Sequence, residues 1–334
     1  MSFSGSRNLQ ELSSRVHPVY ALFFTSLLYL TIGPFFASPR TGTVAFDVGI
    51  APYINESSQQ LGLFIFTLLF FAIVLLFSLK PAKLVDNVGK FLAPGLVVLL
   101  AVLLIAVITN PMGAMEAPQE TYTNGAFITG FLEGYNTMDA LASLVFGIIV
   151  INAIRSMGVT SNTEILKATV KAGSIAIVLL GAIYVGIAYL GATSTQAYGI
   201  FETGGPILSN GASHYFGTFG SVLLAIAITL ACLTTAIGLT VANAEYFHTL
   251  FPKVSYKTLV VFFATITFVI ANFGLANIIT YSVPVLMFLY PLAIVLILLT
   301  FVSPLFNHAT IVYSSTIAVT FLISIFDGLK SLCE

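Results

Sequence analysis

Long apolar runs separated by short polar segments dominate this sequence. A helix that crosses the hydrocarbon core of a membrane needs about 20 consecutive, mostly apolar residues. Runs of this length predict an all-α, polytopic membrane protein with about nine transmembrane helices. The expected helices span residues 18–38, 61–79, 91–109, part of 126–154, 172–193, 217–244, 258–274, 279–301 and 309–326. The last three share one uncharged stretch, which we expect to break at ANFGLAN (271–277) and SPLFNHA (303–309).

The positive charges between these runs predict the orientation of the chain. If the helices simply alternate in direction, ten of the twelve lysines and arginines fall on one side of the membrane. These ten are Arg7, Arg15, Lys80, Lys83, Lys90, Arg155, Lys167, Lys171, Lys253 and Lys257. Because short cytoplasmic loops are enriched in lysine and arginine, the N-terminus is expected in the cytoplasm.

The fourth helix carries polar residues where a membrane helix should be apolar. Its uncharged part, 140–154, spans only about 22 Å at 1.5 Å per residue, which is less than the hydrocarbon thickness. The remaining depth must include the residues just upstream, among them Asp139, and a membrane-embedded carboxylate needs a partner or water. Two interpretations remain open: a polar residue that caps a helix at the outer surface, or two half-helices whose free backbone groups face a substrate.

Two adjacent hydroxyls lie within the long uncharged run 215–244. Ala231 precedes Thr234 and Thr235 by three and four residues, so all three share one face of a helix. Threonines in membrane helices often donate to the carbonyl three or four residues earlier, and that alone would explain the pair. Alternatively, the two hydroxyls and the Ala231 carbonyl offer three neutral oxygens to a small cation such as Na⁺.

The composition supports a membrane protein and excludes several other classes. Of the 334 residues, 58% are hydrophobic and only 7% are charged, where soluble proteins carry about a quarter. A net charge of −1 gives no indication of a nucleic-acid partner. The two cysteines and four histidines have no metal-ligand spacing, and no cofactor other than a coupling ion is expected. Paired catalytic groups are not visible either, so we do not expect an enzyme.

Several long segments resemble the bacterial branched-chain amino acid:cation symporters. These segments are YLTIGPFFASPRTGTVAFDVGIAP (29–52), NVGKFLAP (87–94), GYNTMDALASLVFGIIVINAIRSMGVT (134–160), ACLTTAIGLTVANAEYF (231–247), YSVPVLMFLYP (281–291) and ISIFDGLK (323–330). The resemblance implies a transporter of leucine, isoleucine and valine driven by Na⁺ or H⁺. It also implies the inverted-repeat fold of the amino acid–polyamine–cation superfamily, with two units of five helices in opposite orientations.

The resemblance assigns the two polar features to known parts of that fold. The segment 126–154 corresponds to the broken sixth family helix, which implies substrate contacts at Gly134, Tyr135, Asn136, Thr137, Met138 and Asp139. The run 217–244 corresponds to the eighth helix, and Ala231, Thr234 and Thr235 match its A-x-x-[ST]-[ST] pattern for Na⁺. We expect the substrate ammonium at Asp139 and the branched side chain against Met138, Leu141 and Phe146.

The chain also differs from the family pattern. It begins in a part that resembles the loop before the third family helix, so residues 1–334 are expected to be a single transporter domain that lacks the first two helices and ends early. An inactive truncated remnant and an ion channel therefore stay open as alternatives. The sequence gives no indication of oligomeric state, of the coupling ion, or of which branched-chain amino acid is preferred.

Overall fold

Helices make up almost all of the secondary structure in the computed structural model, which describes residues 8–79, 83–118, 120–307 and 309–333. The α-helices are α1 (Leu9–Ser13), α2 (Pro18–Leu30), α3 (Ala37–Gly49), α4 (Gln59–Leu79), α5 (Lys83–Thr109), α6 (Ala126–Glu133), α7 (Asp139–Ser156), α8 (Asn162–Tyr198), α9 (Gly204–Leu250), α10 (Tyr256–Ala271), α11 (Leu275–Val302) and α12 (Thr310–Cys333). No strand occurs within these described ranges. The all-α prediction is therefore confirmed.

Six helical stretches of the described chain are long and apolar enough to cross a membrane. They are Pro18–Tyr53, Glu56–Leu79, Asn162–Tyr198, Gly204–Leu250, Leu275–Phe306 and Thr310–Leu332. A bent pair within α7 adds a seventh candidate, and two shorter apolar helices, Ala93–Thr109 and Tyr256–Ala271, lie where further spans were expected. The count of nine spans and the inverted repeat stay predictions. The side chains of Arg7, Lys80, Lys83 and Lys90, which support the expected orientation, lie outside the described part.

Both breaks expected in the uncharged stretch near the C-terminus are present. α10 ends at Ala271 and α11 begins at Leu275, with Gly274 between them at a φ of 83°. α11 ends at Val302, and a 3₁₀ turn leads to Asn307, whose φ of 49° points the chain into α12. Positive φ is the conformation that glycine and asparagine adopt at least cost, so these residues end the helices where the apolar pattern alone would continue.

Residue contacts divide the chain into two compact units. Unit 1 contains residues 1–32, 120–178 and 280–334, and unit 2 contains residues 33–119 and 179–279. The expectation of a single domain over 1–334 remains a prediction.

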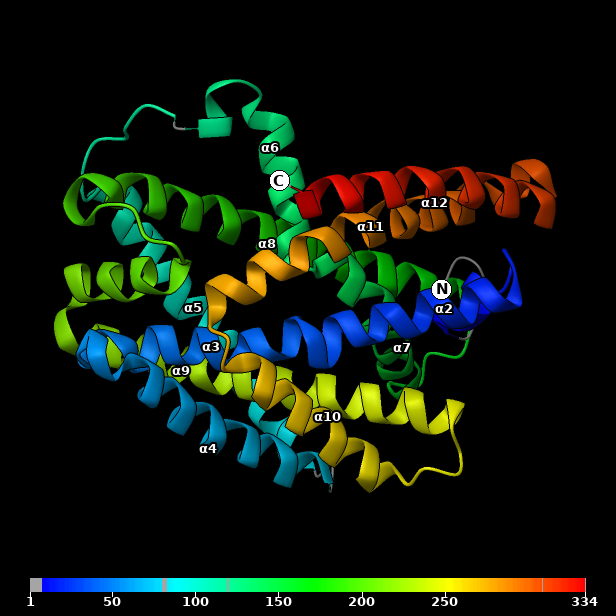
Figure 1. Cartoon of the computed structure of the whole chain (residues 1–334), viewed down its shortest axis with the longest axis horizontal. Helices are drawn as coiled ribbons and strands as arrows, with labels where there is room; N and C mark the ends of the chain where they lie inside the picture. Colours follow the sequence, from blue (N-terminus) through cyan, green and yellow to red (C-terminus); the bar gives the residue numbers. More distant parts are fainter. Residues whose placement is uncertain (1–7, 80–82, 119, 308, 334) are drawn as a thin grey trace. The chain divides into compact units, whose positions relative to one another are not determined.

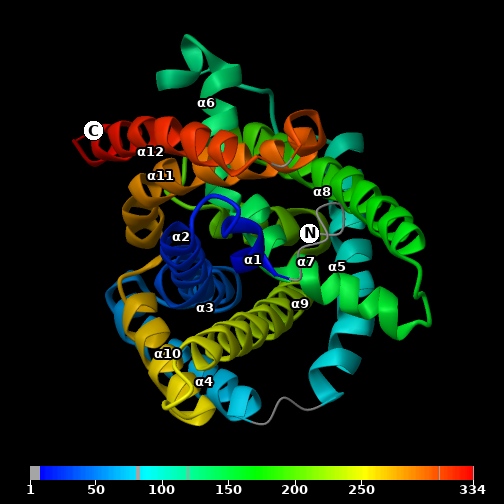
Figure 2. The same ribbon diagram turned by 90° about the vertical axis from the view of Figure 1, so that its right-hand side faces the viewer.

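Unit 2 is built around α3 and α9, which lie side by side in both views (Figures 1 and 2). α4 and α10 pack on this pair and on each other, and α5 packs on α9. Its core is apolar and aromatic; the fully buried side chains include Val74, Leu190 and Ala236. Because lipid tails are as apolar as these side chains, their burial stabilises the helix contacts mainly through tight packing.

In unit 1, α11 and α12 run alongside each other (Figures 1 and 2). Phe288 of α11 meets Phe321 of α12 edge to face, with ring centroids 5.5 Å apart. The Tyr313 hydroxyl donates to the Leu299 carbonyl at 3.3 Å, and Tyr313 is completely buried. These contacts hold α11 against α12.

The span Pro18–Tyr53 is interrupted in its middle. Residues 31–35 form one π-helical turn, and Gly33 leaves helical geometry with φ −90° and ψ −118°. Pro34, which cannot donate a backbone hydrogen bond, follows directly. In unit 2 the fully buried Asn243 of α9 packs so closely on Gly33 that a Cβ there would collide with its amide group. The sequence GP at 33–34 predicts this kink, but only the structure shows what fills it.

Candidate functional site

The predicted break in the fourth expected helix is present in unit 1. α6 ends at Glu133, residues 134–137 form a 3₁₀ turn, and α7 begins at Asp139. Between them Met138 adopts the left-handed conformation, with φ 58° and ψ 11°. A residue other than glycine pays about 1–2 kcal/mol for this conformation, and the burial of Met138, which is 3% exposed, offsets the cost.

Hydrogen bonds within the turn fix its shape. The Thr137 hydroxyl donates to the Gly134 carbonyl at 2.9 Å and lies 3.4 Å from the Asp139 N–H, which donates to it. The Asn136 amide donates to the Glu133 carboxylate at 2.9 Å. Thr137 therefore caps α7 weakly, and Asp139 lies in the first turn of that helix rather than serving as its cap.

The turn carries one negative charge at the start of a helix. Asp139 is exposed, as are Gly134 and Thr137. The free N–H groups and the partial positive charge at a helix N-terminus favour a carboxylate at this position. A substrate carboxylate would be repelled by Asp139, whereas an ammonium group would be attracted.

Met138 and Leu141 are buried, whereas residues that line an open substrate pocket would be accessible. Both are buried in unit 1, with exposed fractions of 3% and 0%, while Phe146 is half-buried. Contacts between a branched side chain and these residues therefore require the turn to open. The assignment of Met138 to the substrate site stays a prediction.

One residue near the turn does not follow from the sequence pattern. Tyr290 of α11 stacks on Tyr135, with ring centroids 4.1 Å apart and ring planes 6° from parallel. The Thr137 side chain, the Asp139 carboxylate and the backbone N–H of Ala140 act electrostatically on its hydroxyl. A tyrosine followed by Pro291 within the apolar stretch 283–299 of α11 is the local signal that could have drawn attention to it.

The hydroxyl pair lies on α9 in unit 2. Thr234 and Thr235 both donate to the Ala231 carbonyl at 2.9 Å, so the three oxygens converge on one face, as the spacing predicts. Thr234 is half-buried and Thr235 is exposed. Each hydroxyl that donates its proton still has lone pairs, so these bonds fit both self-paired threonines and a cation site. The assignment to Na⁺ stays a prediction.

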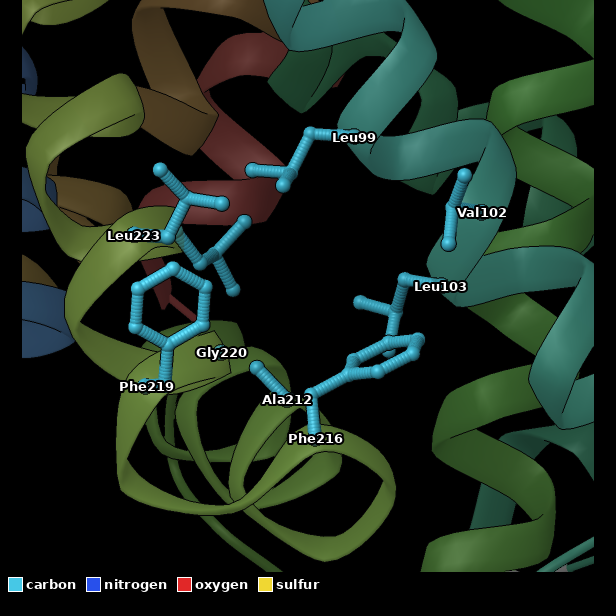
Figure 3. A pocket seen from close by; sticks show the side chains of 9 residues that line it. Leu99, Val102, Leu103, Ala212, Phe216, Phe219, Gly220 and Leu223 are labelled. Atoms are coloured by element: carbon cyan, nitrogen blue, oxygen red, sulfur yellow. The ribbon is translucent and has the colours of Figure 1, made fainter.

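Unit 2 also contains an apolar cavity of about 150 Å³ between α5 and α9. Figure 3 shows Leu99, Val102 and Leu103 on one side. The other side is formed by residues that include Phe216 and Phe219. None of the lining side chains offers a hydrogen bond or a charge, so the cavity cannot bind the charged ends of an amino acid.

The whole chain matches the family described as branched-chain amino acid transport protein, over residues 1–334. The chain belongs to this family. It is 46% identical over 329 residues to the branched-chain amino acid permease BrnQ of Bacillus subtilis (strain 168), covering 98% of this chain and 75% of that protein. It is 42% identical over 323 residues to BrnQ of Escherichia coli (strain K12), covering 97% and 73% of the two chains.

A third relative carries a different name. The branched-chain amino acid transport system 3 carrier protein of Pseudomonas aeruginosa is 43% identical over 306 residues, which cover 92% of this chain and 69% of that protein. These members of the branched-chain amino acid transport family are named as permeases and carriers, not as enzymes. Together with the apolar helices described above, membership makes this chain a multi-pass membrane protein.

Proposed function

We propose that the protein transports leucine, isoleucine and valine into the cell in symport with a cation, Na⁺ or H⁺, through the cell membrane. The observation that carries the proposal is the interrupted helix α6–α7, which places Asp139 at the start of a half-helix. Discontinuous helices of this kind form the substrate sites of many secondary transporters. The names of the relatives support branched-chain amino acids as the substrate class.

In this proposal the substrate ammonium binds at Asp139 and at the carbonyl groups of residues 134–137. Two of these carbonyls already accept a bond, Gly134 from Thr137 and Tyr135 from Met138, and each retains a second lone pair. The substrate carboxylate needs a donor outside residues 134–139, because Asp139 already occupies the N-terminal end of α7.

For the coupling ion we propose Na⁺ at Ala231, Thr234 and Thr235. The three oxygens converge on one face of α9, which supports a site for a small cation. Oxygen ligands are the kind that hard cations prefer, and two or three more must come from elsewhere. If the coupling ion is H⁺ instead, Asp139 is the side chain that we expect to carry it.

Uptake of radiolabelled leucine into sealed vesicles tests this proposal directly. Saturable uptake driven by an imposed Na⁺ gradient would support the symporter, and uptake driven only by a pH gradient would assign the coupling to H⁺. Ion flux that does not saturate would indicate a channel. Neither flux nor uptake, in a chain shown to be folded, would indicate an inactive remnant.

A further inference from the structure

The Tyr290 hydroxyl is a buried polar group without a hydrogen-bond partner among the described residues. Tyr290 is only 3% exposed, and its hydroxyl makes no hydrogen bond of ordinary geometry with the described residues. Buried polar groups in proteins almost always have a partner, which can be protein, ordered water or a ligand. A hydroxyl left unpaired in this way therefore indicates a place for a small polar group.

The surroundings of this hydroxyl define the chemistry of that group. Tyr290 stacks on Tyr135 of the turn, and Thr137, Asp139 and the Ala140 N–H act electrostatically on its hydroxyl, at the N-terminus of an 18-residue helix. Thr137 and Asp139 are exposed, whereas Tyr290 is buried. A molecule bound at the exposed carboxylate therefore reaches the buried hydroxyl only when the turn opens, as for contact with Met138.

Aromatic packing holds the hydroxyl in this place. The ring of Tyr290 lies flat on that of Tyr135, and Phe131 meets Tyr135 edge to face, with centroids 5.6 Å apart. Both arrangements are favourable for aromatic rings and restrict their rotation. The Tyr290 hydroxyl is thus fixed beside the start of α7.

We propose that Tyr290 is a further substrate-binding residue, whose hydroxyl oxygen accepts a hydrogen bond from the substrate ammonium. The inference rests on the proposed function. A phenol can donate its proton to the Asp139 carboxylate and still accept from an ammonium group through its oxygen lone pairs. The ammonium has three protons to donate, and Asp139, Tyr290 and Thr137 each offer it an oxygen. A carboxylate ligand fits less well, because Asp139 repels it.

Equilibrium binding to the purified full chain tests the proposal. Tyr290→Phe keeps the ring and its stacking and removes only the oxygen. We expect its Kd for leucine to rise about tenfold, as for loss of one hydrogen bond to a charged group. Tyr313→Phe is the matched control, because Tyr313 is also a buried tyrosine of unit 1, but its hydroxyl is paired with Leu299. Its Kd for leucine should equal that of the wild type.

A second ligand separates direct contact from an indirect effect on the fold. 4-Methylpentanoate has the carbon skeleton and carboxylate of leucine but no ammonium, and its Kd is measured by competition with leucine. We expect Tyr290→Phe to leave this Kd unchanged. Because both constants refer to the folded fraction, partial misfolding of the variant does not alter the comparison.

Three results would overturn the proposal. If the wild type binds leucine and Tyr290→Phe binds it equally well, the hydroxyl contacts only water. An equal loss of affinity for both ligands would show that Tyr290 acts through the shape of the site. Absence of leucine binding by the folded wild type would overturn the proposed function, and this inference with it.

Discussion

Two interruptions of apolar helices in this molecule differ in what surrounds them. At Gly33 the gap in the span Pro18–Tyr53 is filled, because the Asn243 amide leaves no room for even a Cβ atom. At Gly134 the turn between α6 and α7 is open, and a Cβ added there would meet no heavy atom within 4 Å. The first interruption is closed by the protein itself, and the second leaves space.

The difference indicates which interruption serves packing and which can bind a ligand. A break in a membrane helix frees backbone polar groups that lipid cannot satisfy, so it persists only against protein, water or a ligand. At Gly33 the fully buried side chain of Asn243 packs against the interruption. At the turn between α6 and α7, no heavy atom lies within 4 Å of a Cβ built at Gly134, and Thr137 and Asp139 are exposed.

The largest effect that we predict comes from adding a side chain at Gly33, where the interruption is already filled. Gly33→Ala places a Cβ against the Asn243 amide. We expect a loss of about 3 kcal/mol of stability, typical of severe overpacking, measured by thermal unfolding of the purified protein in detergent. Gly134→Ala, at a helical φ of −57° and without neighbours, should change stability by less than about 0.5 kcal/mol.

A second substitution identifies the cause of the loss. Asn243→Ala removes the colliding amide, so Gly33→Ala combined with Asn243→Ala should be more stable than the sum of the two single losses predicts. Strict additivity of the two losses would show that the amide does not close this break.

The next largest effect concerns the open break and its charge. Asp139→Asn removes the negative charge at nearly constant shape, and a hydrogen bond to a charged group is worth about 1.5–3 kcal/mol. We therefore expect leucine affinity to fall more than tenfold in vesicle uptake. Glu164→Gln is the matched control, because Glu164 also lies in the first turn of a helix, α8.

Other outcomes for Asp139→Asn carry distinct meanings. A shifted pH optimum at unchanged leucine affinity would identify Asp139 as a proton carrier. If neither the leucine affinity nor the pH optimum changes, Asp139 only stabilises the start of α7. The main evidence for a binding site between α6 and α7 would then be lost.

The sequence predicted the parts of this structure that depend on local chemistry. Asp139 and the short apolar run behind it predicted where α7 begins, and the segments ANFGLAN and SPLFNHA predicted where α10 and α11 end. In each case a polar residue, glycine or asparagine interrupts an apolar run, and the reason lies within a few residues of the break.

Two kinds of feature could not be predicted in this way. Helices α8 and α9 extend well beyond their expected 22 and 28 residues, to 37 and 47 residues, because hydropathy reports the thickness of the membrane and not where backbone hydrogen bonding stops. α9 in fact contains a kink at Gly217, where the apolar run was expected to begin. The contacts Gly33–Asn243 and Tyr135–Tyr290 join distant parts of the chain, and no local pattern encodes them.

The smallest effect that we predict tests the hydroxyl pair, which resembles the closed break in that both already contact other groups of the protein. Thr234 and Thr235 already donate to the Ala231 carbonyl, so a cation gains only their lone pairs. Replacing both by alanine should therefore raise the Na⁺ concentration for half-maximal leucine uptake about three- to tenfold, as for neutral ligands that together contribute about 1 kcal/mol. Membrane insertion should not change.

Two matched variants decide whether the hydroxyls of Thr234 and Thr235 bind Na⁺. Serine at both positions keeps the oxygens and should retain the wild-type Na⁺ activation curve. Thr265→Ala on α10 removes another back-bonded hydroxyl, which donates to the Val261 carbonyl at 2.8 Å, and should also leave the curve unchanged. If the double alanine variant keeps the wild-type curve, the pair serves only the helix. The open break between α6 and α7 would then be the sole candidate site of the two for which the geometry favours a ligand.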